Sequence, residues 1–181
     1  DVLLEILRAL KSAGIFVVVS AGNSGPSCGT INDTPAWHSA DTFSVGAYDH
    51  RSEKIAGFSS RGPSGFDGEV GPDIVAPGVS IRSAVTGGGY QGGFWSGTSM
   101  AGPHVAGLVA LIWSANPDLI GKVDETSQLI IDTARPIPSN GCMGVNADGE
   151  GIDEGAAVVP NNYYGHGMIN AYEAVKAALN R

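Results

Sequence analysis

Two short segments contain the residue types that acyl-transfer chemistry needs. Ser99 begins a helix-forming run at 99–116, where unpaired backbone N–H groups and the positive end of the helix dipole can stabilise developing negative charge. Asn23 follows the apolar run 15–21, so it lies beyond the carboxyl end of a predicted strand, where α/β proteins place their sites. Taken alone, Ser99 is better explained as a helix cap, and Asn23 as part of an ordinary Gly-Asn turn. The surrounding residues must decide between chemistry and local structure.

The residues around Ser99 form a long, specific motif. The sequence SGTSMAGPHVAG at 96–107 resembles the nucleophile motif of the subtilisin-like serine peptidases (subtilases), G-T-S-M-A-x-P-H-V-A-G, at every fixed position. The sequence SAGNSG at 20–25 resembles the oxyanion segment A-A-G-N-x-G of the same family, with Ser20 in place of a small residue. Further subtilase-like segments follow in the expected order at 58–63, 73–78 and 164–170. The resemblance therefore extends from about residue 14 to residue 174.

This resemblance implies a role for each matched site residue. Ser99 is expected to be the catalytic nucleophile, and Asn23 is expected to donate its side-chain amide to the oxyanion of the tetrahedral intermediate. Trp95 is expected to flank the leaving-group side of the site. The expected substrate-binding residues, which include one wall of the primary specificity pocket at 20–22, are Ser20, Ala21, Gly22, Trp95 and Thr98.

The base that activates the serine hydroxyl is missing from the sequence. Subtilases carry their triad in the order Asp, His, Ser, and neither the D-S/T-G nor the H-G-T-H type of segment occurs here. His104 lies about 140° round the predicted helix from Ser99 and matches the structural histidine of the family. His38, His50 and His166 have no flanking catalytic motif. A structural or solvated role is therefore expected for all four histidines.

We therefore expect the catalytic domain to be only partly contained in this sequence. The chain begins at Asp1 without Met, directly on a helical pattern, and we expect residues 1–181 to form the carboxyl-terminal portion of a single subtilase catalytic domain. The amino-terminal part of the same domain, with Asp and His, is an expected partner, and the chain alone is expected to be inactive. Two alternatives stay open. One is a non-catalytic, subtilase-like binding or regulatory module, and the other is a different hydrolase that recruits His38 or His166.

Composition narrows the remaining classes of function. The net charge is −8 without a basic cluster, which argues against a nucleic-acid partner, and the longest apolar run, 15–19, is far too short to span a membrane. A polypeptide substrate and a secreted location follow from the resemblance. Cys28 and Cys142 lack metal-ligand spacing, and we hypothesise that they form a disulfide, as is typical of secreted domains.

An acidic, glycine-rich segment provides the one candidate for a cation. Asn146, Asp148 and Glu150, followed by Gly151 and Glu154, partly imitate a calcium loop. The bidentate glutamate at position 12 is absent, because Ala157 stands there, so a solvated loop is favoured. We expect no cofactor for the chemistry and no metal among the site residues, while a structural calcium ion stays open.

The elements that must position these residues follow from periodicity and turn signals. Helices are predicted at 1–14, 99–116, 124–134 and after Asn170, which with Glu173 resembles a capping box. The β-branched run 15–21 predicts a parallel strand buried on both faces, and further strands are predicted at 43–47, 74–76 and 81–85. These patterns and the resemblance together predict an α/β fold, a subtilisin-like three-layer sandwich with a mainly parallel sheet and helices on both faces.

Overall fold

The computed structural model describes residues 1–181 except 1, 37, 39, 143, 146–150 and 153–155. Its centre is a sheet in which β1 (Val18–Ser20) and β4 (Ile74–Pro77) both pair in parallel with β2 (Phe43–Asp49). The short β3 (Lys54–Ile55) pairs antiparallel with the end of β2. The fold is thus α/β with a mainly parallel central sheet, as predicted.

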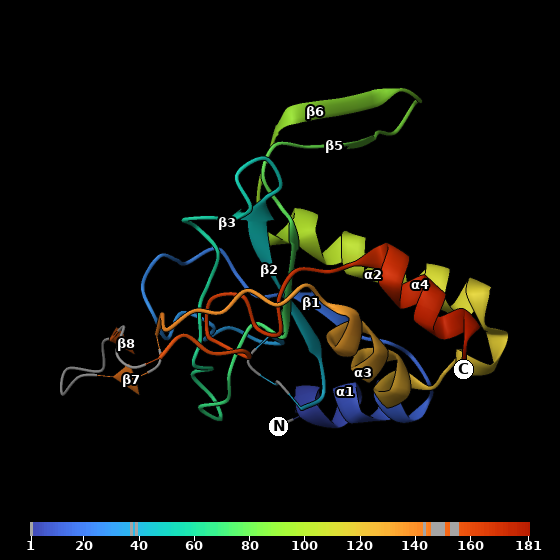
Figure 1. Ribbon diagram of the computed structural model, residues 1–181, viewed down its shortest axis with the longest axis horizontal. Helices are drawn as coiled ribbons and strands as arrows, with labels where there is room; N and C mark the ends of the chain where they lie inside the picture. Colours follow the sequence, from blue (N-terminus) through green and yellow to red (C-terminus); the bar gives the residue numbers. More distant parts are fainter. Residues whose placement is uncertain (1, 37, 39, 143, 146–150, 153–155) are drawn as a thin grey trace.

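Helix α2 (Thr98–Ala115) covers one face of this sheet and contacts β1, β2 and β4 (Figure 1). Its small residues allow the close approach, since Ala101 is fully buried and packs in one core with Val45 and Ile74. Two more helices, α3 (Val123–Thr133) and α4 (Ala171–Leu179), add Leu129, Ile130, Ala174 and Ala178 to this core. The helix that carries Ser99 is therefore held along most of its length.

Side chains at the ends of the helices fix how the helices pack. The indole of Trp113 donates a hydrogen bond to Thr126 Oγ1 at 3.0 Å, which joins α2 to α3. Asn116, after α2, donates to the carbonyl of Ala178 in α4 at 2.9 Å and accepts from Asp118 N–H at the start of η1 (Pro117–Leu119). Asn170 accepts from Glu173 N–H, which confirms the predicted cap of α4.

Strand β1 differs from its prediction. It is shorter than the run 15–21, and its residues are half-buried rather than buried on both faces. Among the described residues β1 pairs only with β2, whereas the far edge of β4 is covered by the segment around Met168 through a parallel bridge to Val75. The expectation of a strand buried on both faces was wrong, because the side chains of β1 are only partly covered, as is common for a strand with a neighbour on one side only.

The remaining elements are one more helix and two pairs of strands. Helix α1 (Val2–Ser12) buries Leu7 and forms an ion pair from Lys11 to Asp124 at the beginning of α3. The hairpin of β5 (Ile81–Ala84) and β6 (Tyr90–Trp95) projects from the body above the start of α2 (Figure 1). Strand β6 was not predicted, because its two adjacent glycines obscure the alternation of a strand. A last pair of strands, β7 (Gly144–Val145) and β8 (Gly151–Ile152), lies in the acidic excursion.

Candidate active site

Ser99 lies in the first turn of α2 and is exposed. The helix begins at Thr98, and Gly97 occupies the N-cap position without a side-chain cap. The alternative that Ser99 is only a helix cap is therefore wrong. In the described part of the chain the N–H of Ser99 has no partner, because its position in the first turn places it before the start of the intrahelical ladder. Ser99 thus presents both a hydroxyl and a free backbone donor at the positive end of a helix.

Asn23 lies beside this helix start, with its side-chain amide held in one orientation. Its Oδ1 atom accepts hydrogen bonds from the N–H of Thr98 at 2.9 Å and from Thr98 Oγ1 at 3.0 Å. Since the oxygen end is occupied by two donors, the Nδ2 end is left to point elsewhere, and it forms no hydrogen bond within the described residues. Asn23 is exposed, so Nδ2 is accessible to a ligand. The amide and the Ser99 N–H are two unpaired donors on neighbouring elements, as the predicted oxyanion site requires, and their role in catalysis stays a prediction.

Thr98 holds the loop of Asn23 in place through hydrogen bonds. It is fully buried, and besides its two hydrogen bonds to Asn23 its Oγ1 atom accepts from the N–H of Gly22 at 3.3 Å. Its predicted contact with substrate stays a prediction, but its observed contacts are with the loop that carries Asn23. The sequence motif contains Thr98 without revealing this positioning role, since a motif shows neighbours along the chain and not across it.

The predicted wall of the specificity pocket, residues 20–22, leaves the sheet at the carboxyl end of β1. Ala21 is buried and donates its N–H to the carbonyl of Val45, which continues the ladder with β2. Gly22 has a φ of +105°, and a Cβ there would lie 2.8 Å from Ser60 Oγ. Ser20 is half-buried and faces Gly102 of α2. The three residues therefore lie beside the helix of Ser99, and their contact with substrate stays a prediction.

Trp95 closes the other side of the site. It ends β6, is 44% exposed and packs on Phe94 with ring centroids 5.7 Å apart. A hollow of about 590 Å³ lies between Trp95, Met100 and the hairpin, and a neighbouring hollow of about 300 Å³ contains Ser99, Met100 and His104. Ser99 thus opens onto a surface shared by α2 and the β5–β6 hairpin, which is the predicted leaving-group side.

No histidine among the described residues forms a hydrogen bond with Ser99. His104 shares a hollow with Ser99, but its Nδ1 atom lies 2.9 Å from the carbonyl of Met100, one turn back in the same helix. His38 is buried against Phe66, His50 is exposed on the β2–β3 turn, and His166 donates its backbone N–H to Asp73. Among the described residues, the predicted nucleophile and the predicted oxyanion donors therefore lie together without a base–orienter pair beside them.

Two titrating groups lie together away from Ser99. The side chain of Asp73 accepts from Ser44 N–H at 2.6 Å and Ser44 Oγ at 2.7 Å, yet burial outweighs these bonds and raises the pKa of Asp73 to about 6. Burial lowers the pKa of His166, against an opposing effect of Asp132. Asp73 and His166 line one hollow with Asp67 and Glu69. Neither Asp73 nor His166 lines the two hollows beside Ser99.

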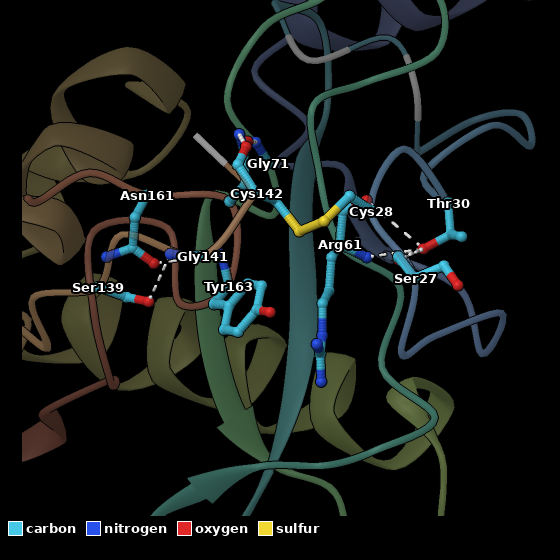
Figure 2. Close-up of a disulfide and its surroundings, with 11 residues drawn as sticks. Ser27, Cys28, Thr30, Arg61, Gly71, Ser139, Gly141, Cys142, Asn161 and Tyr163 are labelled. Carbon is cyan, nitrogen blue, oxygen red and sulfur yellow. Dashed lines mark hydrogen bonds between the residues drawn. A yellow bond between two sulfur atoms is a disulfide. The ribbon is translucent and has the colours of Figure 1, made fainter. Parts of the chain in front are cut away.

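Cys28 and Cys142 form a disulfide, which confirms that hypothesis (Figure 2). Their Cα atoms are 5.5 Å apart although 114 residues separate them in the chain. Figure 2 shows the bond bridging the loop after Asn23 to the segment that leads into the acidic excursion, with Arg61 and Tyr163 nearby. The guanidinium carbon of Arg61 lies 4.1 Å from the centroid of the Tyr163 ring. The backbone N–H of Arg61 also donates to Thr30 Oγ1, so this loop is held from two sides.

The candidate calcium residues Asn146, Asp148 and Glu150 lie outside the described residues. In the part of the chain that the structure describes, no group of three or more His, Cys, Asp or Glu side chains is arranged to hold a metal ion. Within the same residues, none of the helices has the length and apolar character needed to cross a membrane.

An exposed serine at a helix amino terminus, beside a held amide that follows a parallel strand, is an arrangement typical of serine hydrolases with an α/β fold. Comparison with known protein families identifies the family to which the chain belongs. The model of the subtilase family (Peptidase S8) matches residues 5–167, and the chain belongs to this family.

Known relatives agree with this assignment. The chain is 41% identical over 179 residues to bacillopeptidase F of Bacillus subtilis (strain 168), covering 96% of this chain and 11% of that protein. It is 36% identical over 193 residues to the serine protease AprX of the same organism, covering 97% of this chain and 38% of that protein. It therefore spans well under half of either relative.

Among solved structures, the prenylagaramide maturation protease PagA has the same fold. The TM-score is 0.68 at 24% identity, with 100% of this chain and 57% of that chain covered. The subtilisin-like architecture is thereby confirmed.

Proposed function

We propose that this chain is the nucleophile-bearing portion of a secreted serine endopeptidase. Ser99 attacks the scissile carbonyl of a polypeptide after a histidine, contributed by the amino-terminal part of the same catalytic domain, removes its proton. Asn23 Nδ2 and the Ser99 N–H stabilise the resulting oxyanion. The intermediate then collapses, the C–N bond breaks, and the amine leaves with the proton that the histidine took from Ser99. Water, deprotonated by the same histidine, finally hydrolyses the acyl-enzyme and frees Ser99. The names of the relatives, bacillopeptidase and serine protease, support peptide-bond hydrolysis.

One observation carries the proposal: both hydrogen bonds to Asn23 Oδ1 come from Thr98, the residue before the nucleophile. This contact fixes the amide beside Ser99 and leaves its donor end free. A pure binding module would have no need for a free donor pair beside an exposed hydroxyl. The open edge of β1 and the hollow beside Ser99 are the surfaces available to the segment with Asp and His. The disulfide supports a secreted location.

Labelling with a fluorophosphonate tests the proposal. The isolated chain is expected to remain unlabelled at neutral pH, because an unactivated serine hydroxyl is a poor nucleophile and no base lies beside it. The whole protein, or the chain mixed with the upstream segment, is expected to be labelled and to cleave protein substrates. Ser99→Ala is expected to abolish both, whereas Ser52→Ala, on the exposed β2–β3 turn, is expected to change neither.

The two alternatives predict other outcomes. Absence of labelling in the whole protein would favour the non-catalytic module. Rapid labelling of Ser99 in the isolated chain would show that a base lies within it and would bring back His38 or His166.

A further inference from the structure

The two hollows beside Ser99 have an unusual distribution of charge for so acidic a protein. The net charge of the chain is −8, yet no Asp, Glu or Lys lines either hollow. Arg82, on β5, is the one side chain in the two linings that carries a full charge throughout the neutral range. Whatever binds along the hairpin therefore meets a single, local cation.

The Arg82 side chain stacks on a tyrosine of the neighbouring strand of the hairpin. The Arg82 guanidinium carbon lies 4.5 Å from the centroid of the Tyr90 ring on β6. Between them Gly92 faces Arg82 across the strands, and a Cβ at Gly92 would lie 2.4 Å from Arg82 Cβ. Stacking on an aromatic ring restricts a guanidinium without neutralising it. Tyr90 is 65% exposed, so the charge remains in contact with solvent and with incoming ligands.

Three other arginines in the described residues contrast with Arg82. Arg8, Arg51 and Arg135 each pair with a carboxylate, of Asp41, Asp49 and Glu53 respectively. Arg82 is exposed and forms no ion pair or side-chain hydrogen bond within the part of the chain described. A fixed, unpaired cation next to a nucleophile is suited to recognise an anionic group.

We propose that Arg82 selects substrates with an acidic side chain on the leaving-group side of the cleaved bond. The inference rests on the proposed peptidase function and adds a specificity to it. The guanidinium is directed along the hairpin towards Tyr90, away from its root at Trp95, so the acidic residue is the second or third after the cleaved bond. Its carboxylate pairs with Arg82 at the exposed surface while Trp95 and Met100 contact the residue next to the bond.

The test compares internally quenched peptides in the whole protein. One peptide backbone carries Glu, Gln or Lys at the second or third position after the cleaved bond, and kcat and KM are measured for each. Exposed ion pairs contribute modestly, so kcat/KM is expected to be about 2- to 5-fold higher for Glu than for Gln, mainly through KM. The preference is expected to shrink with added salt. The same exchange on the acyl side is expected to have no such effect.

Substitutions test whether Arg82 causes the preference for the Glu peptide. Arg82→Gln is expected to remove it, Arg82→Lys to keep it in part, and Arg82→Glu to reverse it in favour of the Lys peptide. Gly92→Ala is expected to weaken the preference, because its Cβ would clash with both the Cα and the Cβ of Arg82 and so shift this part of the hairpin while the charge is kept. Arg181→Gln, at the exposed carboxyl end, is the matched control and is expected to retain the full preference.

The outcomes separate this inference from the proposed function. An unchanged Glu-to-Gln ratio in Arg82→Gln, in a protein that cleaves the uncharged peptide normally, would overturn the role of Arg82 alone. A charge preference confined to the acyl side would equally contradict it. Failure of the unmodified whole protein to cleave any peptide would instead overturn the peptidase function.

Discussion

Asn23 is positioned by its contact with Thr98, and the two side chains act as one unit. Thr98 is buried and holds both Asn23 and the N–H of Gly22, so the donor amide, the strand end and the helix start share one residue. Preorganised donors stabilise a transition state because they need not reorient as charge develops. The geometry of the oxyanion site is therefore set before any substrate binds.

Asn23→Ala in the whole protein is expected to lower kcat far more than it changes KM, since its amide acts on the developing oxyanion. The expected loss, about 100- to 1,000-fold, is a range borrowed from subtilisin, a member of this family. Steady-state kinetics with one peptide substrate measure it. Asn32→Ala, an exposed asparagine in the following loop, serves as the control. A normal kcat in Asn23→Ala would remove Asn23 from the site.

Met100 follows the nucleophile and lines both hollows beside it. Oxidation to the sulfoxide adds bulk and polarity at the reacting centre, so peroxide is expected to reduce peptidase activity markedly. Met100→Leu is expected to keep most activity after the same treatment. Mass spectrometry should locate the added oxygen on Met100 in preference to the buried Met168, which is 1% exposed. Full activity after confirmed oxidation of Met100 would contradict the prediction.

The predicted helices agree with the structure where a local sequence pattern is enough to define them. Periodicity was sufficient for α1, α3 and α4, and the Asn170 cap was found by its spacing to Glu173. The nucleophile motif singled out Ser99 and the oxyanion segment singled out Asn23, and the structure places Asn23 beside the start of the helix that carries Ser99. Their catalytic roles stay predictions. The open edge of β1 and the course of β6 depend on which strands are neighbours, and that information is spread over distant residues. Sequence periodicity alone could not provide it.

Strand β1 passes into the loop of Asn23 through Gly22, so this glycine is expected to control activity as well as stability. Its φ of +105° disfavours a side chain, and an alanine Cβ would lie 2.8 Å from Ser60 Oγ. Gly22→Ala is expected to lower kcat about 10-fold or more by displacing Asn23.

Gly29→Ala is the matched control for this substitution. Gly29 also has a positive φ, +64°, but a Cβ there would meet nothing within 4 Å. It is expected to lower the melting temperature slightly and to leave kcat unchanged. Equal kcat values in the two variants would show that the turn at Gly22 does not position Asn23.

The stability of the whole molecule is expected to depend on the protonation of Asp73. Burial raises its folded pKa to about 6, above the unfolded value of about 3.9, so the folded state retains a proton that the unfolded state releases. The free energy of unfolding is therefore expected to fall as the pH rises from about 4 to about 6, by up to about 3 kcal/mol. Contact of Asp73 with water through its open hollow would reduce this figure.

Denaturant unfolding at several pH values, with Asp73→Asn, measures the effect. The amide oxygen of asparagine still accepts from Ser44 but does not titrate, so this contribution to the pH slope should disappear. Asp33→Asn, at an exposed position, is expected to keep the slope of the unmodified protein. Identical slopes in all three proteins would show that Asp73 is ionised across this range.

The Cys28–Cys142 disulfide makes most of the polypeptide a covalent ring, and the exposed glycine triplet 87–89 at the hairpin tip lies within that ring. A single cut at the tip, by a second enzyme molecule or an added protease, would open the ring without releasing a piece. The nicked protein is expected to migrate as one band without reductant and as two bands with it. Ser99 and Asn23 would then belong to different peptides of one working molecule. Separation of the pieces without reductant would show that the ring is not closed in solution.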